Sequence, residues 1–415
     1  MRPRPEVDDD PVESHARMRL FLSLHLPAVA LGLGTGITQP VLPVLAESFE
    51  VGIGLAATVF IAQMVGGAVG TLPTGHAIDR IGRRKIMLAG PVIVAIASFL
   101  TATAGSIPEL LVYRFVAGWG QQMWMLARLT VIADTGRADQ RGKQITGMFS
   151  SQRVGMLAGP AIGGFTAAAW GLGVPFVIHG VFALLAVIPS FFIVSETRAL
   201  ALTPQSAPGD GPSPMEPFDW RSLLAYPFPM VFLGQFMANL ARGGIEGGGV
   251  LFLYAVYAYG ASTATLGVLS SVMAAVGIPI ALFAGWVMDR FGRKWTIVPG
   301  STLLSMGLLF MAATSFWSLS FTMFLTAFVT LHLTVNLMIG SMQTLGTDIA
   351  PPQARGRFFG VSRLVAQSGR ISSPGSFAIF SEFVGFGAAF VFMAGSAAVA
   401  AITIGRFVKE TLRRL

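Results

Sequence analysis

Residues 75–85 read GHAIDRIGRRK, and residues 285–294 read GWVMDRFGRK. The two stretches share five residue types at one constant offset of 210 positions. The matched pairs are Gly75 and Gly285, Asp79 and Asp289, Arg80 and Arg290, Gly82 and Gly292, and Arg83 and Arg293. A loop that recurs at a fixed spacing indicates that the chain contains two copies of one structural unit.

Further matches extend this repeat over most of the chain. They share an offset of 214 positions and follow the same order in each half. They pair Asp134 with Asp348, Arg141-Gly142 with Arg355-Gly356, Gly155 with Gly369, Pro160 with Pro374, and Glu196-Thr197 with Glu410-Thr411. We therefore expect two halves whose equivalent segments lie on equivalent elements.

The composition is that of an integral membrane protein. Hydrophobic residues make up 53% of the 415 residues, charged residues only 12%, and the mean hydropathy is +0.68. A helix needs about 20 apolar residues to cross a bilayer. Runs of suitable length lie at 21–46, 52–74, 86–105, 108–133, 144–168, 172–194, 223–257, 262–285, 295–314, 317–343, 357–381 and 384–407. The sequence thus predicts an all-α integral membrane protein with 12 transmembrane helices in two pseudo-symmetric six-helix bundles.

The repeat and the apolar runs divide the chain into three parts. Residues 1–197 are expected to form the N-terminal bundle with a short cytoplasmic N-terminus, and residues 223–415 the C-terminal bundle. Between them, residues 198–222 contain TPQSAPGDGPSPMEP, which is typical of a flexible linker. The first apolar run is longer than the core of a signal peptide, so we expect it to be the first transmembrane helix.

The formal net charge of +8 reflects basic residues in alternate loops. Arg and Lys concentrate in the termini and in every second loop. The intervening loops carry only Glu47, Glu50, Glu109 and Glu382 as charged residues. This distribution follows the positive-inside rule and predicts a multi-pass protein of the cell membrane with both termini in the cytoplasm. The charge therefore needs no nucleic-acid partner to explain it.

Several kinds of chemistry lack the residues they need. The chain has no cysteine, and its five scattered histidines show no metal-ligand spacing. The sequence contains neither a P-loop nor a recognisable nucleophile motif. It therefore predicts no metal, no other cofactor and no enzymatic activity.

The duplicated loop, with its pattern G-x-x-x-D-R-x-G-R, resembles the signature of the major facilitator superfamily over nearly the whole chain. A second run resembles the antiporter motif of the drug:proton antiporter branch, although Thr146 stands where that motif often has a glycine. This run comprises Gly155, Gly159, Pro160, Gly163 and Gly164. If the predicted transmembrane helices are numbered 1 to 12 in the order of the apolar runs given above, the resemblance implies a secondary transporter in which helices 1, 4, 7 and 10 line a central cavity.

The loop residues are expected to control access to that cavity. Gly75 and Gly82 would allow a tight reversal at the membrane surface. The resemblance implies that Asp79 faces the start of helix 11 near Gly356, because the backbone dipole at a helix N-terminus favours an anion.

Ion pairs and a second latch follow from the same resemblance and from the repeat. The expected ion pairs are Arg83 with Asp134 and Arg293 with Asp348. Asp289 would face the start of helix 5 near Gly142. Such contacts would close the cytoplasmic side. The alternative that Arg80, Arg290 and the neighbouring basic residues only set topology remains open.

Polar residues inside the spans are expected to face the interior of the bundle. An ionised side chain against lipid at mid-bilayer costs about 2.5–3.5 kcal/mol even on the lenient insertion scale. In four spans, polar or small residues recur at three- and four-residue spacings, which is one helical face. They are Gln235, Asn239, Arg242 and Glu246 in helix 7; Arg114, Gly118, Gln121, Met125 and Arg128 in helix 4; His332, Asn336, Gly340 and Gln343 in helix 10; and Gly32, Thr35 and Gln39 in helix 1. Arg153 in helix 5 and Arg363, Gln367 and Arg370 in helix 11 add to these faces.

Glu246 is the candidate for reversible protonation, because it is the one acid in these faces. Burial raises the proton affinity of a carboxylate, whereas a nearby arginine such as Arg242, four positions earlier, lowers it. The five glycines at 243, 244 and 247–249 weaken the helix and predict a bend there. A fixed Arg242–Glu246 ion pair is the alternative. The resemblance implies that Arg114 takes part in proton transfer, while binding of an anionic substrate by Arg114 is equally open.

These observations favour a monomeric secondary active transporter that exports a small amphipathic or drug-like molecule in exchange for protons. Its partners would be the substrate, protons and the lipid bilayer. The first alternative is proton-coupled uptake of an organic anion, suggested by the excess of arginine over acid. A transporter-like membrane receptor is the second alternative, but it predicts a large soluble domain or a long tail.

Overall fold

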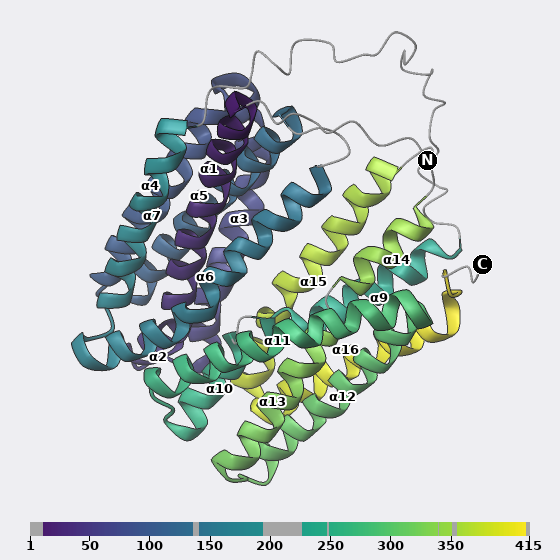
Figure 1. Ribbon diagram of the computed structural model, residues 1–415. Coiled ribbons are helices and arrows are strands. Elements are labelled where there is room, and N and C mark those ends of the chain that lie inside the picture. The colour runs from purple at the N-terminus through teal and green to yellow at the C-terminus, as the bar shows by residue number, and fades with distance from the viewer. Residues whose placement is uncertain are drawn as a thin grey trace.

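A computed structural model describes residues 11–135, 141–193, 226–246, 249–338, 340–350 and 355–411, and all regular secondary structure in these ranges is helical (Figure 1). The N-terminal half contains α1 (Pro11–Thr38), α2 (Val41–Glu47), α3 (Ile53–Ile81), α4 (Arg83–Ala102), α5 (Ile107–Thr135), α6 (Arg141–Trp170) and α7 (Val174–Ile193). The C-terminal half contains α9 (Phe228–Arg242), α10 (Gly249–Tyr259), α11 (Thr263–Phe291), α12 (Lys294–Phe316), α13 (Phe321–Leu337), α14 (Ser341–Ile349), α15 (Arg355–Phe383) and α16 (Phe386–Phe407). The expected linker at 198–222 lies outside the described residues.

Each of the expected transmembrane spans coincides with one helix or with two consecutive helices. In the described part of the chain, eight segments are long and apolar enough to cross a membrane. The other expected spans are α5, α6, the α9–α10 pair and α15. These are the spans that carry interior charges such as Arg114, Glu246 and Arg370. Because such side chains face other helices rather than lipid, their lower hydropathy is compatible with a membrane-spanning position.

The same helix pairs pack together in both halves. In the N-terminal half, α1 packs against α6 and α7, and α5 packs against α3 and α4. In the C-terminal half, the equivalent helices do the same: α9 packs against α15 and α16, and α13 packs against α11 and α12. The protein therefore consists of two pseudo-symmetric bundles, as the duplicated loops predicted.

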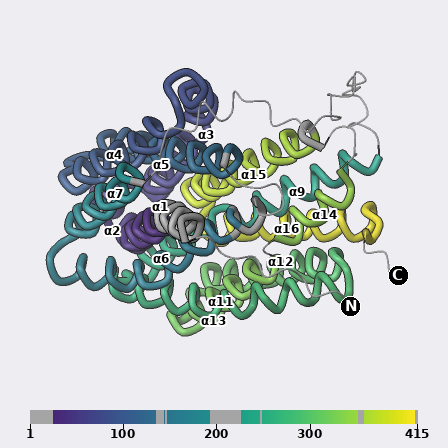
Figure 2. The backbone as a smooth tube through the Cα atoms, turned by 45° about the horizontal axis from the view of Figure 1, so that its top comes forward, coloured from purple at the N-terminus to yellow at the C-terminus, as the bar shows by residue number. Residues whose placement is uncertain are grey.

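The two bundles contact each other through a reciprocal pair of interfaces. Helix α6 of the first bundle packs against α11 of the second, and α15 of the second packs against α3 of the first. Figure 2 shows α15 lying between α9 and the N-terminal group of helices. Under the repeat, α6 corresponds to α15 and α11 corresponds to α3. The pseudo-twofold axis therefore runs between these two interfaces.

The bundles meet mainly at one end. We call the end that carries the loops at residues 82 and 292 the motif end, and the opposite end the far end. Toward the far end, Thr263 Oγ1 donates a hydrogen bond to Gly164 O (3.1 Å), and Tyr257 Oη donates to Val51 O (2.9 Å). In Figure 1 the two groups of helices touch near α2 and α10 and spread apart toward the motif end.

Three spans are broken where they pass through the interior. Helix α1 ends at Thr38 and α2 begins at Val41. Helix α9 ends at Arg242 and α10 begins at Gly249, so the bend predicted within the span 223–257 is present. Helices α13 and α14 are separated by a break at Gly340, whose φ of +79° is left-handed. The sequence did not predict the breaks within the spans 21–46 and 317–343.

Candidate functional site

Glu246 lies in the break between α9 and α10. The glycines before it let α15 approach closely, since a Cβ added to Gly243 would lie 2.8 Å from the Cα of Arg370. The backbone N of Gly244 donates a hydrogen bond to Ser373 Oγ of α15 (2.8 Å). The break is therefore held against α15 by backbone contacts, and the carboxylate of Glu246 is placed beside that helix.

The carboxylate of Glu246 contacts two arginines. Its Oε1 lies 3.4 Å from Arg242 Nε, and its Oε2 lies 2.9 Å from Arg370 Nη2 of α15. The side chains of Arg242, Glu246 and Arg370 are 14%, 27% and 44% exposed. All three can therefore be reached by small molecules or water between the bundles. The sequence identified Arg370 as an interior arginine but not as a partner of Glu246.

A chain of polar contacts continues from this site along α9. Arg242 Nη2 donates to Asn239 Oδ1 (3.4 Å), and Asn239 Nδ2 donates to the carbonyl oxygen of Gln235 (2.7 Å). The side-chain oxygen of Gln235 accepts from Ser362 Oγ of α15 (2.8 Å). The polar residues predicted to share one face of the span 223–257 thus form one connected polar surface, and Ser362 of α15 adds a hydrogen bond to it.

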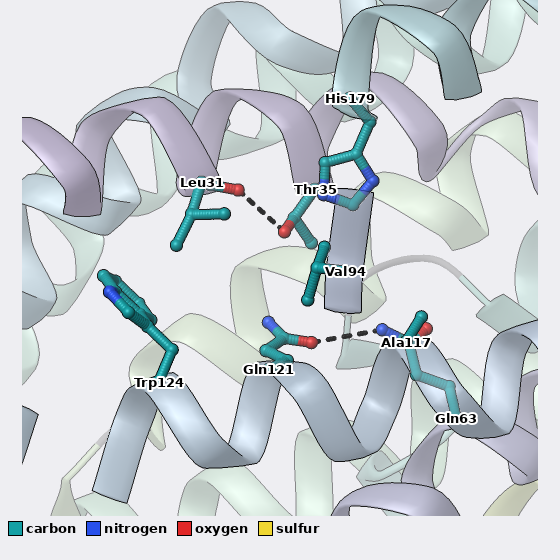
Figure 3. Close-up of a pocket in the computed structure, with 8 residues that line it drawn as sticks. All are labelled: Leu31, Thr35, Gln63, Val94, Ala117, Gln121, Trp124 and His179. Atoms are coloured by element: carbon teal, nitrogen blue, oxygen red, sulfur yellow. Dashed lines mark hydrogen bonds between the residues drawn. The ribbon is translucent and has the colours of Figure 1, made fainter. Parts of the chain in front are cut away.

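A second polar group lies inside the N-terminal bundle. Arg114 is buried and donates a hydrogen bond to Gln63 Oε1, and Gln63 Nε2 donates to Gln121 Oε1 (3.2 Å). These residues lie beside a small cavity that Figure 3 shows in close-up. Its lining residues are Leu31, Thr35, Gln63, Val94, Ala117, Gln121, Trp124 and His179. Arg114 therefore bonds within its own bundle and not with Glu246.

Gln63 and His179 were missed by sequence reasoning as members of this group. Gln63 is the one amide in an apolar span whose other polar residues are threonines, so no periodic polar face predicted its role. The Nδ1 of His179 lies 3.1 Å from Ser98 Oγ, and the added Cβ of a residue at Gly34 would overlap the His179 ring. Thr35 Oγ1 donates to Leu31 O (2.8 Å), which is a bond within its own helix.

The candidate residues of the spans 21–46 and 317–343 lie apart from the polar surface around Glu246. His332 stacks on Phe328 with ring centroids 4.1 Å apart, and its Nδ1 lies 3.0 Å from Phe328 O. Asn336 Nδ2 donates to His332 O (2.8 Å). Gln343 is exposed in α14, beyond the break at Gly340, and Gln39 is half-buried between α1 and α2. Among the described side chains, no hydrogen bond connects His332, Asn336 or Gln343 to Glu246.

At the motif end, both ion pairs implied by the resemblance are present. Arg83 Nε lies 3.0 Å from Asp134 Oδ2, and Arg293 Nε lies 2.9 Å from Asp348 Oδ2. Each pair joins elements of the same bundle. In the second bundle, Glu410 adds a cap, because its carboxylate accepts from the backbone N atoms of Arg293 and Lys294 (both 3.0 Å).

One expectation about this loop is wrong. Gly75 lies inside α3, and an added Cβ there would meet nothing within 4 Å, so Gly75 makes no reversal. The reversal is made by Gly82 and Gly292, with φ of +109° and +112°. Such angles favour glycine because a Cβ would clash with the backbone. The loops therefore use one essential glycine each.

The loop residues of the expected latches lie at the surface of the motif end. Asp79, Arg80, Asp289 and Arg290 are all exposed. The guanidinium of Arg290 lies 5.6 Å from the ring centroid of Trp286 on its own helix. The helix starts near Gly356 and Gly142 lie outside the part of the chain whose surroundings the structure describes.

The glycine run of α6 contacts two different neighbours. Added Cβ atoms at Gly155, Gly159 and Gly163 would overlap carbonyl oxygens of α1, at Val29, Leu33 and Ile37 respectively. An added Cβ at Gly164 would instead overlap Thr263 O of α11, in the other bundle. Pro160 lies next to Gly36 and Gly267. The run therefore joins α6 to its own bundle on one face and to the opposite bundle on the other.

A carboxylate also joins the bundles at the far end. Glu382, at the end of α15, accepts a hydrogen bond from the backbone N of Gly54 (2.8 Å) in the first turn of α3. A Cβ added to Gly52 would lie 2.7 Å from Glu382 Oε1. Since the N-terminus of a helix attracts anions, Glu382 caps α3 across the interface.

Comparisons with known proteins agree with this architecture. The family model described as Major Facilitator Superfamily matches residues 26–374 and 231–414. The chain is 25% identical to Quinolone resistance protein NorA of Staphylococcus aureus, covering 69% of this chain and 72% of that protein. It is 24% identical to Multidrug resistance protein 1 of Bacillus subtilis, covering 82% and 84%.

A solved structure has the same fold. The crystal structure of a D-xylose-proton symporter aligns with a TM-score of 0.75 and 18% identity, covering 94% of this chain and 98% of that chain. The duplicated loops, the matched helix pairs in both bundles and the family model therefore lead to one conclusion. The chain belongs to the Major Facilitator Superfamily of membrane transporters.

Proposed function

We propose that the protein exports a small amphipathic molecule across the cell membrane in exchange for protons. The observation that carries this proposal is the position of Glu246. Among the described residues it is the one carboxylate inside a span rather than near a membrane surface, and it contacts arginines of two helices. The names of two relatives, a quinolone resistance protein and a multidrug resistance protein, support a drug-like substrate.

Glu246 couples the proton to the position of α15. When ionised, its carboxylate binds Arg370 and so ties the break in helix 7 to α15. When a proton binds to Oε2, the negative charge that holds the Arg370 guanidinium is lost. The break and α15 are then free to separate. Binding of substrate favours release of that proton, because it stabilises the arrangement in which the polar surface of Gln235, Asn239 and Arg242 is intact.

The bundles rock about this interior site. The motif end is the cytoplasmic end, since it carries the basic loops. The present arrangement has its contacts at the far end and so receives substrate from the cytoplasm. In the opposite arrangement, the exposed Asp79 and Asp289 reach the starts of α15 and α6 and close the cytoplasmic end. Residues 198–222 link the two bundles.

The proposal is tested with purified protein in proteoliposomes loaded with a radiolabelled quinolone. With the motif end facing the internal solution, imposing an acidic external pH should drive saturable efflux, and a protonophore should abolish it. Saturable uptake that is accompanied by proton entry would instead establish symport. No saturable flux in either direction would contradict a drug-like substrate.

The far-end cap gives a separate prediction. The Glu382→Gln substitution removes the charge that caps α3, and a hydrogen bond to a charged group contributes about 1.5–3 kcal/mol. We expect the far end to open more often. A single cysteine at Phe60, beside the interface residue Gly249, should then react about tenfold faster with an impermeant external reagent. The chain has no native cysteine to give background labelling.

Glu109→Gln is the matched control for this measurement. Glu109 also accepts from a glycine backbone N, that of Gly105 (3.0 Å), but within one bundle. Its substitution should leave the labelling rate unchanged. Equal rates in Glu382→Gln and Glu109→Gln would show that the cap does not hold the bundles together.

A further inference from the structure

Arg128 is a buried arginine whose guanidinium has no hydrogen-bond partner among the described residues. It lies on α5 and is 0% exposed. Its Nε, Nη1 and Nη2 atoms have no hydrogen-bond partner in the described part of the chain. The other interior arginines differ, because Arg114 bonds to Gln63 while Arg242 and Arg370 bind Glu246. Arg128 therefore has unsatisfied N–H groups inside the bundle.

The guanidinium lies close to an aromatic ring. The Cζ of Arg128 lies 3.7 Å from the ring centroid of Trp124. A cation–π contact of this kind is strongest in a desolvated site. It uses the flat face of the guanidinium and leaves the N–H groups at the edge free. That edge matches the two oxygens of a carboxylate, which it can bind through two parallel hydrogen bonds.

The protein itself supplies no described acid for this edge. Asp134 is bound to Arg83 at the motif end, and Asp79 is exposed there. Glu47 and Glu109 are at the far end. The nearby titratable group is His25 of α1, whose Nδ1 lies 2.6 Å from Ser151 Oγ. An anion that satisfies Arg128 must therefore come from outside the described chain.

The ring that covers Arg128 also lines the small cavity of the N-terminal bundle. Figure 3 shows Trp124 on one side of that cavity, facing Leu31, with Gln121 one helical turn away. The cavity thus has an apolar wall and an amide, and its Trp124 ring is in contact with the guanidinium of Arg128, which does not itself line the cavity. A ligand that displaces the ring gains both the apolar wall and the cation.

We propose that Arg128 binds the carboxylate of the transported molecule and that Trp124 packs against its apolar ring, so the substrates are organic anions with a planar apolar part. This inference rests on the proposed transport function and names its substrate class. The interior favours an anionic over a cationic substrate. Its carboxylate, that of Glu246, already has two arginine partners, and no second described acid is available there to attract a cation.

Three ligands with the same naphthalene ring test the inference on the full-length protein: naphthoate, which is charged, and naphthamide and methyl naphthoate, which are neutral. We expect the wild type to bind naphthoate with a Kd at least about tenfold lower than that of either neutral analogue, because a charge-assisted pair is worth more than 1.4 kcal/mol. Binding is measured by ligand-dependent thermal shift and by competition with radiolabelled naphthoate. Equal affinity for the three ligands overturns the inference without any variant.

Substitution then identifies the residue. Arg128→Gln should raise the Kd of naphthoate at least about tenfold and leave the Kd of methyl naphthoate unchanged. Arg128→Lys should give an intermediate Kd, since an ammonium lacks the planar fork. The control Arg406→Gln, an exposed arginine at the end of α16, should bind all three ligands like the wild type. A naphthoate Kd that is unchanged in Arg128→Gln overturns the assignment.

The results distinguish a failure of this inference from a failure of the proposed function. If a pH gradient drives efflux of methyl naphthoate and naphthoate binds no better than the ester, the transporter is proton-coupled but the substrate class is wrong. If naphthoate binds through Arg128 and no pH gradient moves it, the substrate class stands and proton exchange fails.

Discussion

The Glu246→Gln variant is expected to lose transport driven by a pH gradient while it keeps exchange of substrate across the membrane. Glutamine has nearly the same shape, and its one side-chain oxygen can still accept a hydrogen bond from one of the two arginines, Arg242 or Arg370. It cannot bind and release a proton in the accessible range. The pH-driven rate should therefore fall by about 100-fold or more. Exchange of labelled for unlabelled substrate requires no net proton movement and should continue.

Both activities are measured in the same proteoliposomes. The pH-driven flux is started by acidifying the external solution, and exchange is measured at equal pH on both sides. Glu109→Gln, which changes a carboxylate near the far end, should keep both rates. Retained pH-driven flux in Glu246→Gln would establish that Glu246 forms a fixed ion pair with its arginines. Loss of both rates would place Glu246 in substrate binding or folding.

The Gly163→Ala variant is expected to fold poorly. Its new Cβ would overlap the backbone oxygen of Ile37, and a backbone atom cannot move aside by changing rotamer. Helices α1 and α6 would have to separate over several turns. Overpacking of this kind costs about 1–3 kcal/mol or more. We expect a clear loss of monodisperse protein in size-exclusion chromatography and a lower melting temperature.

Two further glycine-to-alanine substitutions serve as controls for this prediction. Gly395→Ala adds the same methyl group at an exposed position with nothing within 4 Å, so it should be neutral. Gly164→Ala meets Thr263 of the other bundle, so it should fold but fail to close the far end. Normal folding and transport in Gly163→Ala would mean that α1 and α6 are not packed as tightly as the structure describes.

The sequence predicted the features that follow from the cost of charge in a membrane. Glu246 and Arg242 had to face the interior, and the glycines after them had to weaken the helix, so the site and the bend were predictable from local spacing. The family resemblance implied the ion pair of Arg83 with Asp134, and the repeat extended it to Arg293 with Asp348. These predictions needed no knowledge of how the helices tilt.

The features that were missed depend on the packing of distant helices. Arg370 meets Glu246 only because α15 crosses the break at Gly243, and Gln63 meets Arg114 only because α3 packs against α5. The far-end cap by Glu382 exists only when the bundles meet at that end. Gly75 was assigned to a reversal because glycine permits one, although the chain continues as a helix there. The missing information was the relative placement of helices.

The central claim is that the two bundles rock about the interior site, and the distance between α3 and α15 at each end tests it most directly. Two pairs of cysteines for spin labels suffice: Leu72 with Leu364 toward the motif end, and Leu55 with Phe383 at the far end, all of which are exposed. On acidification we expect the motif-end distance to shorten and the far-end distance to lengthen. The Asp79→Asn variant should resist the motif-end shortening. Distances that stay constant, or that change in the same direction at both ends, would contradict the account.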